Sequence, residues 1–205
     1  MKLKTLTVSA VTILLVLTGA SHSSPLKLDK GAIWHVHATG RATAWAYHSN
    51  YHATWLLTCG HAAWDKRMAI NVHRGVGDLQ AAKIVATTGP IGEDLAVIKV
   101  LSPNKPTLKF GRDGRQGDDV YGYGMPGGPP GLYAKGIISG MLAGAQVVSF
   151  QLGSGASGGP IVGADGNVCA MIRTVVNPRT LQEGNGVTKV STIIRWLKAR
   201  RLMPR

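Results

Sequence analysis

The sequence predicts an all-β globular protein with one C-terminal helix. Three observations support this class: the chain of 205 residues contains 27 glycines, only 16% of its residues are charged, and 44% are apolar. A coiled coil or long-helix protein would instead be rich in Ala, Glu, Lys and Leu. Disorder is a poor fit, because aromatic and β-branched residues are spread along the whole chain and can form a core.

Short apolar segments separated by turn residues follow Gly31 in the first half of the chain. Six of them have the length and composition of strands: Ala32–Ala38, Ala42–His48, Ala53–Thr58, Met68–Val72, Ala82–Thr87 and Leu95–Val100. Ser49-Asn50-Tyr51 has the composition of a hairpin tip. The polar stretch 102–106 contains two prolines and marks the best internal boundary.

The second half repeats this pattern and then changes to a helix. Strands are expected at 119–121, 136–138, 146–150, 161–163 and 168–172, and Asp165-Gly166 predicts a hairpin between the last two. Over Ser191–Arg201, apolar residues line one side of a helix and basic residues the other. About a dozen strands in two groups predict either two small barrels or a sandwich.

The first twenty residues have the pattern of a secretory signal peptide. Lys2 and Lys4 form a positive start, an apolar stretch runs from Leu6 to Leu17, and Thr18-Gly19-Ala20 supplies small residues before a cut at Ser21. An uncleaved anchor is the alternative, although a spanning helix needs about 20 apolar residues. The sequence therefore predicts a secreted or periplasmic protein that meets the membrane only during export.

The formal charge is +13, and removal of Lys2 and Lys4 with the signal segment leaves +11. Such an excess favours weak, salt-sensitive binding to anionic surfaces, while a merely solvated basic surface remains the alternative. No phosphate loop, dinucleotide motif or nucleic-acid motif is present, so no cofactor and no specific nucleic acid are expected.

Three segments carry chemistry, in a fixed chain order. His61 follows an apolar strand in Leu57-Thr58-Cys59-Gly60-His61, Asp94 precedes the apolar run Leu95–Ile98, and Ser157 lies in the glycine-rich turn 153–160. A nucleophilic serine needs a base, and the base needs a carboxylate that fixes its tautomer. Taken singly, each of the three residues could be merely structural, and their joint presence indicates catalysis.

His, Asp and a Gly-x-Ser-Gly-Gly-Pro turn in this order resemble the trypsin-like, chymotrypsin-fold serine proteases. The segments 122–126 and 135–140 are similar to the bacterial HtrA-type branch, and 186–190 with 196–198 to the closing strand and helix of trypsins. The resemblance implies two six-stranded antiparallel Greek-key β-barrels and a C-terminal helix, without the HtrA peptide-binding module. After the expected signal peptide over 1–20, it implies a protease domain over 25–205, with barrels over about 30–103 and 107–190 and the helix over about 191–201.

By this resemblance, Ser157 is the nucleophile, His61 the general base and then acid, and Asp94 the residue that orients His61. The backbone N–H groups of Gly155 and Ser157 would form the oxyanion hole. The implied function is a secreted serine endopeptidase that acts on proteins or peptides, with activity rising as His61 loses its proton near pH ~6–7. The alternative is an inactive binding protein on the same fold, which holds an anionic partner through its basic surface.

Departures from the family pattern bear on activation and specificity. Ala156 stands where trypsin-like zymogens carry an Asp for the freed N-terminus, so no such ion pair can form. Arg173 or Thr174 occupies the place of a small residue that supports the Asp. The primary pocket is expected to have Gln151 and Leu152 at its floor and Thr174, Val175 and Gly186 on its opposite wall, and to favour an uncharged side chain.

Histidines and cysteines could form other sites. The histidines of the first half, with Cys59, make neither a CxxC nor an HExxH spacing, so no metal site is expected. His35 and His37 are expected on one strand face. Cys59 and Cys169 could form a disulfide in an oxidising compartment or remain two buried thiols.

Overall fold

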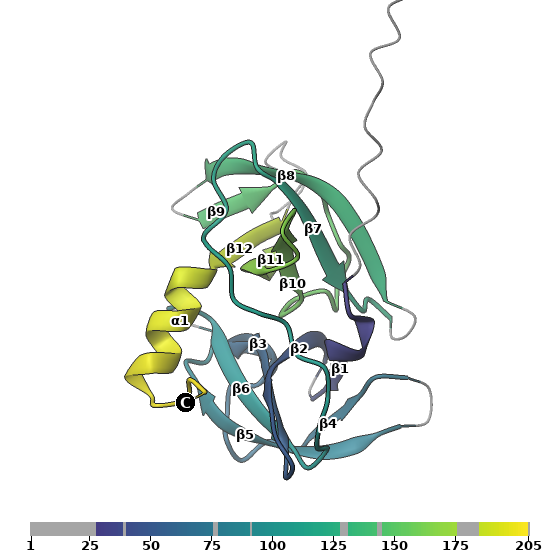
Figure 1. Ribbon diagram of the computed structural model, residues 1–205. Coiled ribbons are helices and arrows are strands. Elements are labelled where there is room, and N and C mark those ends of the chain that lie inside the picture. Colours follow the sequence, from purple (N-terminus) through teal and green to yellow (C-terminus); the bar gives the residue numbers. More distant parts are fainter. Residues whose placement is uncertain are drawn as a thin grey trace, which may run out of the picture.

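The computed structural model describes residues 28–38, 40–75, 78–90, 92–127, 131–142, 145–175 and 185–204, with the side chains of 174 and 175 excepted. The expected signal peptide and its cleavage point lie outside these residues. The described chain forms two closed six-stranded antiparallel barrels and one α-helix, which confirms the fold class expected from the sequence. Figure 1 shows the two barrels stacked, the first below and the second above.

The first barrel contains the first six strands, in the order β1-β2-β3-β6-β5-β4, and β4 pairs back with β1 to close it. A short 3-10 turn, η1 (Lys30–Ala32), precedes it, and η2 (Gly60–Ala62) follows β3. The strands are β1 (Ile33–His37), β2 (Arg41–Ser49), β3 (Thr54–Cys59), β4 (Ile70–His73), β5 (Gln80–Thr87) and β6 (Leu95–Val100).

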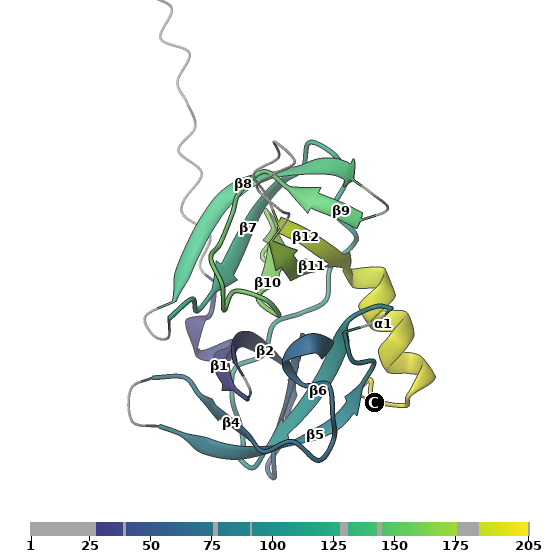
Figure 2. The same cartoon turned by 180° about the vertical axis from the view of Figure 1, so that it is seen from behind.

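The second barrel has the corresponding order β10-β11-β12-β9-β8-β7 (Figure 2). Its strands are β7 (Asp119–Gly124), β8 (Leu132–Leu142), β9 (Ala145–Val148), β10 (Pro160–Gly163), β11 (Val168–Val175) and β12 (Asn185–Lys189). The hairpin expected at Asp165-Gly166 joins β10 to β11, and Gly166 supplies the positive φ of 78° that its turn requires.

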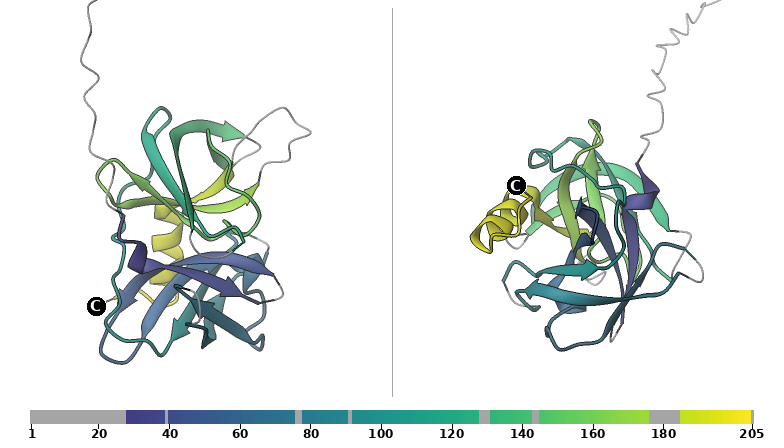
Figure 3. Two further views of the ribbon diagram at one scale, coloured as in Figure 1. Left: turned by 90° about the vertical axis from the view of Figure 1, so that its right-hand side faces the viewer. Right: turned by 60° about the horizontal axis from the view of Figure 1, so that its bottom comes forward.

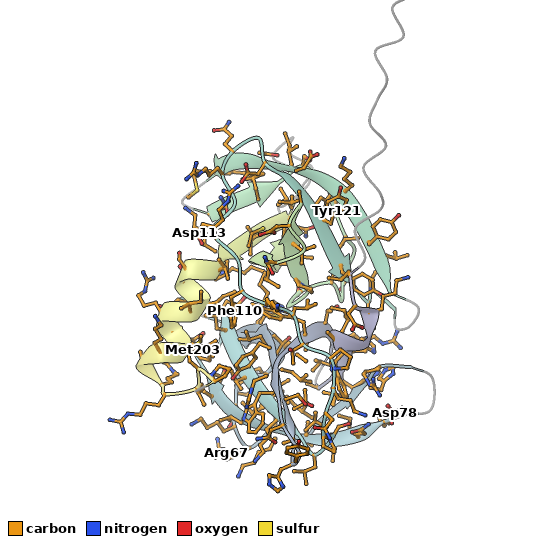
Figure 4. The ribbon with its side chains drawn as sticks, viewed as in Figure 1. Arg67, Asp78, Phe110, Asp113, Tyr121 and Met203 are labelled. Carbon is orange, nitrogen blue, oxygen red and sulfur yellow. The ribbon has the colours of Figure 1, made fainter. Side chains whose placement is uncertain are left out.

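Each barrel encloses apolar side chains, and the first core extends to the junction with the second barrel. Trp34 and Trp45 are fully buried in the first barrel, whereas Ile138, Ile161 and Ile172 centre the second. The connecting segment contributes Phe110, whose ring meets Trp45 edge-on at 5.5 Å between centroids (Figure 4). The chain between the barrels therefore packs as part of the core.

The helix α1 (Val190–Ala199) leaves the second barrel at β12 and lies along the side of the molecule (Figure 3). Its buried residues Ile193, Trp196 and Leu197 belong to the apolar core of the first barrel. Beyond the helix, the Leu202 carbonyl accepts a hydrogen bond from the Tyr47 hydroxyl at 3.1 Å. The C-terminal segment thus fastens the two barrels together. No helix among the described residues is long and apolar enough to cross a membrane.

Candidate active site

Strand pairing brings His61 and Asp94 together. Cys59, the last residue of β3, lies opposite Leu95, the first residue of β6. His61 comes two residues after the end of β3 and Asp94 one residue before the start of β6, so the two meet at the same edge of the sheet. Carboxylate Oδ2 of Asp94 accepts from ring Nδ1 of His61 at 2.9 Å, and Oδ1 accepts from the His61 backbone N–H at 2.7 Å.

Asp94 reaches this geometry through an unusual backbone conformation. Its φ is +55°, in the left-handed region that Asp and Asn tolerate better than most side chains. Its side chain is 4% exposed, whereas that of His61 is 40% exposed. The carboxylate is therefore a buried anchor, and the imidazole opens toward solvent.

A residue of the second barrel supports the Asp94 carboxylate. Nε of Arg173, on β11, lies 3.6 Å from Oδ2 of Asp94. The sequence left open whether Arg173 or Thr174 takes this place, and it is the Arg173 side chain that reaches Asp94. A guanidinium in place of a small polar residue adds a positive charge beside Oδ2, the same carboxylate oxygen that accepts from the His61 ring.

The environment of His61 favours the protonated ring. The hydrogen bond with Asp94 and the contact with Cys59 raise the pKa of His61 to about 10, although desolvation acts in the opposite direction. Sγ of Cys59 lies 3.4 Å from Nε2 of His61. Nε2 is the ring nitrogen that a catalytic base must offer to its nucleophile, so this thiol stands beside the reactive atom.

Ser157 lies in the turn between Leu152 and β10, and Thr43 of the first barrel holds that turn. The Thr43 backbone N–H donates to the Ser157 carbonyl at 2.9 Å, and the Thr43 hydroxyl donates to the Gly155 carbonyl at 2.8 Å. The same hydroxyl accepts from the Met125 N–H at 2.8 Å. Thr43 thus joins β2 to the turn and to the segment after β7, a role that nothing in its local sequence indicates.

Gly158 allows the turn to press against the His61 side of the first barrel. A Cβ at Gly158 would collide with the Thr43 carbonyl and the Thr58 hydroxyl, and its φ of +86° also favours glycine. The turn consequently packs beside Thr58 and Cys59, two residues before His61. Among the described residues the Ser157 hydroxyl makes no hydrogen bond, so the structure joins His61 to Asp94 and places the turn that contains Ser157 against Thr58 and Cys59.

Some backbone donors of the turn bond within the protein, whereas those of Gly155 and Ser157 do not among the described residues. The N–H groups of Ala156, Gly158 and Gly159 bond to carbonyls of Gly153, Ile172 and Ala156 at 3.1, 2.7 and 2.9 Å. Within the described chain, the N–H groups of Gly155 and Ser157 have no acceptor. Ala156 is 1% exposed in the apolar core of the second barrel. The turn is therefore ordered by backbone bonds and apolar packing.

The expected pocket residues are described only in part. Gln151 is exposed, whereas Leu152 is 5% exposed and its N–H donates to Oδ1 of Asn185 at 2.8 Å. Gly186 is buried and pairs with Thr174 across β11 and β12. The side chains of Thr174 and Val175 lie outside the description.

The two cysteines are free, buried thiols. Cys59 belongs to the first barrel and Cys169 to the second, and the disulfide alternative is not formed. Burial raises the pKa of the Cys169 thiol to about 12, which keeps it protonated and unreactive. Cys59 is the cysteine of functional interest, because its sulfur faces His61.

Comparison with known proteins identifies the family. Residues 42–171 match the model of the trypsin-like peptidase domain, a range that includes His61, Asp94 and Ser157. No curated protein matches the sequence. The family match confirms the resemblance to a trypsin-like protease domain.

Three solved structures share the fold. Deg5 is 18% identical with a TM-score of 0.64, over 82% of this chain and 87% of that one. The serine endoprotease from Yersinia pestis is 20% identical with a TM-score of 0.69, over 84% of this chain and 63% of that one. An inactive serine-to-alanine mutant of Rv3671c from M. tuberculosis is 17% identical with a TM-score of 0.69, over 86% and 90%.

Proposed function

The chain belongs to the trypsin-like peptidase domain family, and from this premise we propose that it is a secreted serine endopeptidase with His61, Asp94 and Ser157 as its triad. The observation that carries the proposal is the pairing of His61 with Asp94 beside the Ser157 turn. Asp94 bonds the ring at 2.9 Å, and the turn leaves the Gly155 and Ser157 N–H groups without acceptors. These are the base, the orienting carboxylate and the oxyanion donors that acyl transfer needs.

The reaction proceeds in two halves. Ser157 Oγ bonds to the substrate carbonyl carbon and its proton passes to His61 Nε2, while the carbonyl oxygen becomes an oxyanion held by Gly155 and Ser157 N–H. The C–N bond then breaks, and the proton on Nε2 goes to the leaving amine. A water molecule then gives a proton to the same nitrogen and attacks the acyl carbon. The bond to Ser157 Oγ breaks, this oxygen takes the proton from Nε2, and the acid is released. Asp94 remains ionised and stabilises the imidazolium in both halves.

Proton transfer requires Ser157 Oγ within about 2.6–3.2 Å of Nε2, a distance that often tightens only with substrate bound. Thr43 fixes the turn through two hydrogen bonds, and we expect rotation of the Ser157 and His61 side chains to bring Oγ and Nε2 to this distance. In this movement Nε2 of His61 gives up its contact with the Cys59 sulfur, which lies 3.4 Å away.

The proposed export rests on the sequence pattern of residues 1–20, and the proposed preference for uncharged side chains rests on Gln151. An amide cannot compensate the desolvation of a buried substrate cation as a carboxylate can. The exposure of Gln151 and the burial of Leu152 support a pocket with an apolar wall and a neutral polar mouth.

A serine-reactive phosphonate probe tests the proposal. The purified protein should react stoichiometrically, and mass spectrometry should locate the adduct on Ser157. Ser154 is the matched control, because it is exposed in the same turn. Ser154→Ala should label normally and Ser157→Ala should not. If the folded native protein stays unlabelled, or if Ser157→Ala is labelled as fully as the native protein, the result would instead support an inactive binding protein.

A further inference from the structure

Strand pairing gathers three histidines at the seam that closes the first barrel. His35 and His37 lie two residues apart on β1, so their side chains share one face of the sheet. His73, the last residue of β4, lies directly opposite His35 in the β1–β4 register. Side chains at such opposite and diagonal positions are neighbours. The three rings are consequently adjacent, although His73 is far from the others in sequence.

The ring nitrogens of the three residues converge on one point. Nε2 of His73 lies 2.9 Å from Nδ1 of His35 and 2.8 Å from Nε2 of His37. All three ligand atoms lie within 4.8 Å of one another. Because Nδ1 of His73 lies 2.9 Å from the Gly75 carbonyl, which can only accept, that nitrogen carries the proton and Nε2 presents a lone pair.

Hydrogen bonding alone does not satisfy this arrangement. The single lone pair of His73 Nε2 faces two imidazoles, and only one of them can donate along its axis. A cation shared by the three nitrogens would use every lone pair. The bond from His73 Nδ1 to a backbone carbonyl is also the contact that commonly fixes the tautomer of a metal-binding histidine.

Burial disfavours the charged form of His35 and His37, and the neutral imidazole is the form that binds metal. Burial, followed by the charges of His37, His73 and Arg41, lowers the pKa of His35 to about 4. Burial, followed by the charges of His73 and Arg41, lowers the pKa of His37. Arg41 directs its guanidinium to the Gly127 carbonyl at 3.2 Å. The carboxylate of Asp78, labelled in Figure 4, is paired with the guanidinium of Arg74 at 4.0 Å.

We propose that His35, His37 and His73 form a binding site for a divalent transition-metal ion, with Zn²⁺ as the ion that best fits three imidazoles. Such a site supplies three nitrogen ligands and leaves a fourth position for water. Ligands of tetrahedral zinc lie about 3.3 Å apart, since each is about 2.0–2.1 Å from the ion. Binding therefore requires the pairs at 2.9 and 2.8 Å to lengthen by a few tenths of an ångström, while the His35–His37 separation, which is at most 4.8 Å, adjusts to the same value. His37 is the partly exposed member, so its ring can move to admit the ion.

The proposed ion would join β1 to β4, whose pairing closes the barrel through only three residue pairs. The ion therefore binds the folded barrel in preference to the unfolded chain and stabilises it. This assignment departs from the expectation drawn from sequence spacing, because a cross-strand partner leaves no local motif.

Titration of the full protein, purified without a polyhistidine tag, tests the site. Zn²⁺ should bind with a stoichiometry of one, and at 100-fold excess over Kd it should raise Tm by about 5 °C or more. Co²⁺ in its place should give the visible absorption of a tetrahedral ion, and X-ray absorption of the zinc form should show about three imidazole nitrogens at about 2.0–2.1 Å.

Three variants decide where the ion binds. His37→Gln, which alters the exposed member and spares the barrel core, should weaken Zn²⁺ binding by at least about 100-fold, more than loss of an outer-shell partner does. His52→Gln should bind normally, because His52 is an exposed residue at a loop tip. His61→Gln should also bind normally. Undiminished binding in His37→Gln, loss of binding in His61→Gln, or no binding to the native protein would overturn the proposal.

Discussion

Asp94 holds His61 at two points, accepting from the ring Nδ1–H at 2.9 Å and from the backbone N–H at 2.7 Å. One carboxylate thus fixes both the tautomer of the ring and the position of its backbone. Replacing Asp94 by Asn removes the negative charge and keeps the shape of the side chain, so it should separate the effect on the ring tautomer from the effect on the backbone.

Asp94→Asn should lower kcat by ~10⁴ and leave the fold intact, because an amide can present its N–H to the ring and stabilise the wrong tautomer. Asn also tolerates the left-handed φ of +55° that Asp94 adopts. Steady-state hydrolysis and near-UV circular dichroism measure the two effects. Equal kcat in the variant would show that Asp94 does not orient the base.

The pH dependence of hydrolysis should differ from the expectation drawn from the sequence. Asp94 and Cys59 raise the pKa of His61 to about 10. The value of kcat/KM should therefore keep rising, by about tenfold per pH unit, above the pH of ~6–7 at which the sequence alone predicts a plateau. The stabilising effect of protonated His61 on the fold has the opposite sign. It is fully present below the ordinary pKa of 6.5 and is lost as pH rises through the raised value.

Cys59→Ala should move this limb of the profile to lower pH, because the contact with Cys59 is the second cause of the raised pKa. Cys169→Ala is the matched control, since that thiol is buried in the second barrel. Rate profiles of both variants, measured with one peptide, decide the matter. A Cys59→Ala profile that superimposes on the native one would rule out an effect of the thiol on His61.

Activity should not require a defined new N-terminus. Ala156 is buried among apolar residues of the second barrel and offers no carboxylate to a freed ammonium group. Proteins that begin at Ser21, at Leu26 or with an added Met should therefore have the same kcat/KM within about a factor of 2–3. A large loss in all forms but one would indicate activation by cleavage.

Substrate preference should follow the neutral residue at position 151. Among matched peptides with Arg, Val, Leu or Phe before the cut bond, the uncharged ones should give the higher kcat/KM. Gln151→Asp should raise the value for Arg, whereas Gln116→Asp, an exposed control elsewhere, should not. A native preference for Arg would contradict the assignment of Gln151 to the primary pocket.

Short apolar strands and glycine-rich turns leave local patterns, so the sequence predicted two groups of strands, as barrels or a sandwich, and the order of His61, Asp94 and Ser157. The resemblance to trypsin-like proteases then favoured two barrels. The sequence pattern underestimated β8, which spans Leu132–Leu142 where only 136–138 were expected. Most side chains of β8 are exposed or half-buried, so the apolar alternation that identifies a strand is weak.

The support of Asp94 was uncertain by one residue for a physical reason. The β11–β12 register shifts between Ile172 and Thr174, so strict alternation cannot tell which of Arg173 and Thr174 faces Asp94. The roles of Thr43 and of the three histidines depend on pairing between distant segments, which local sequence does not record. Cys59 was visible beside His61, but only the turn of η2 brings its sulfur to Nε2.

The central claim is that Ser157 is the nucleophile of a peptidase, and hydrolysis of a quenched fluorescent protein substrate by Ser157→Ala tests it most directly. The rate should fall by more than about 10⁴ with unchanged Tm, while Ser154→Ala in the same turn keeps the native rate. Native turnover by a folded Ser157→Ala protein would contradict the account.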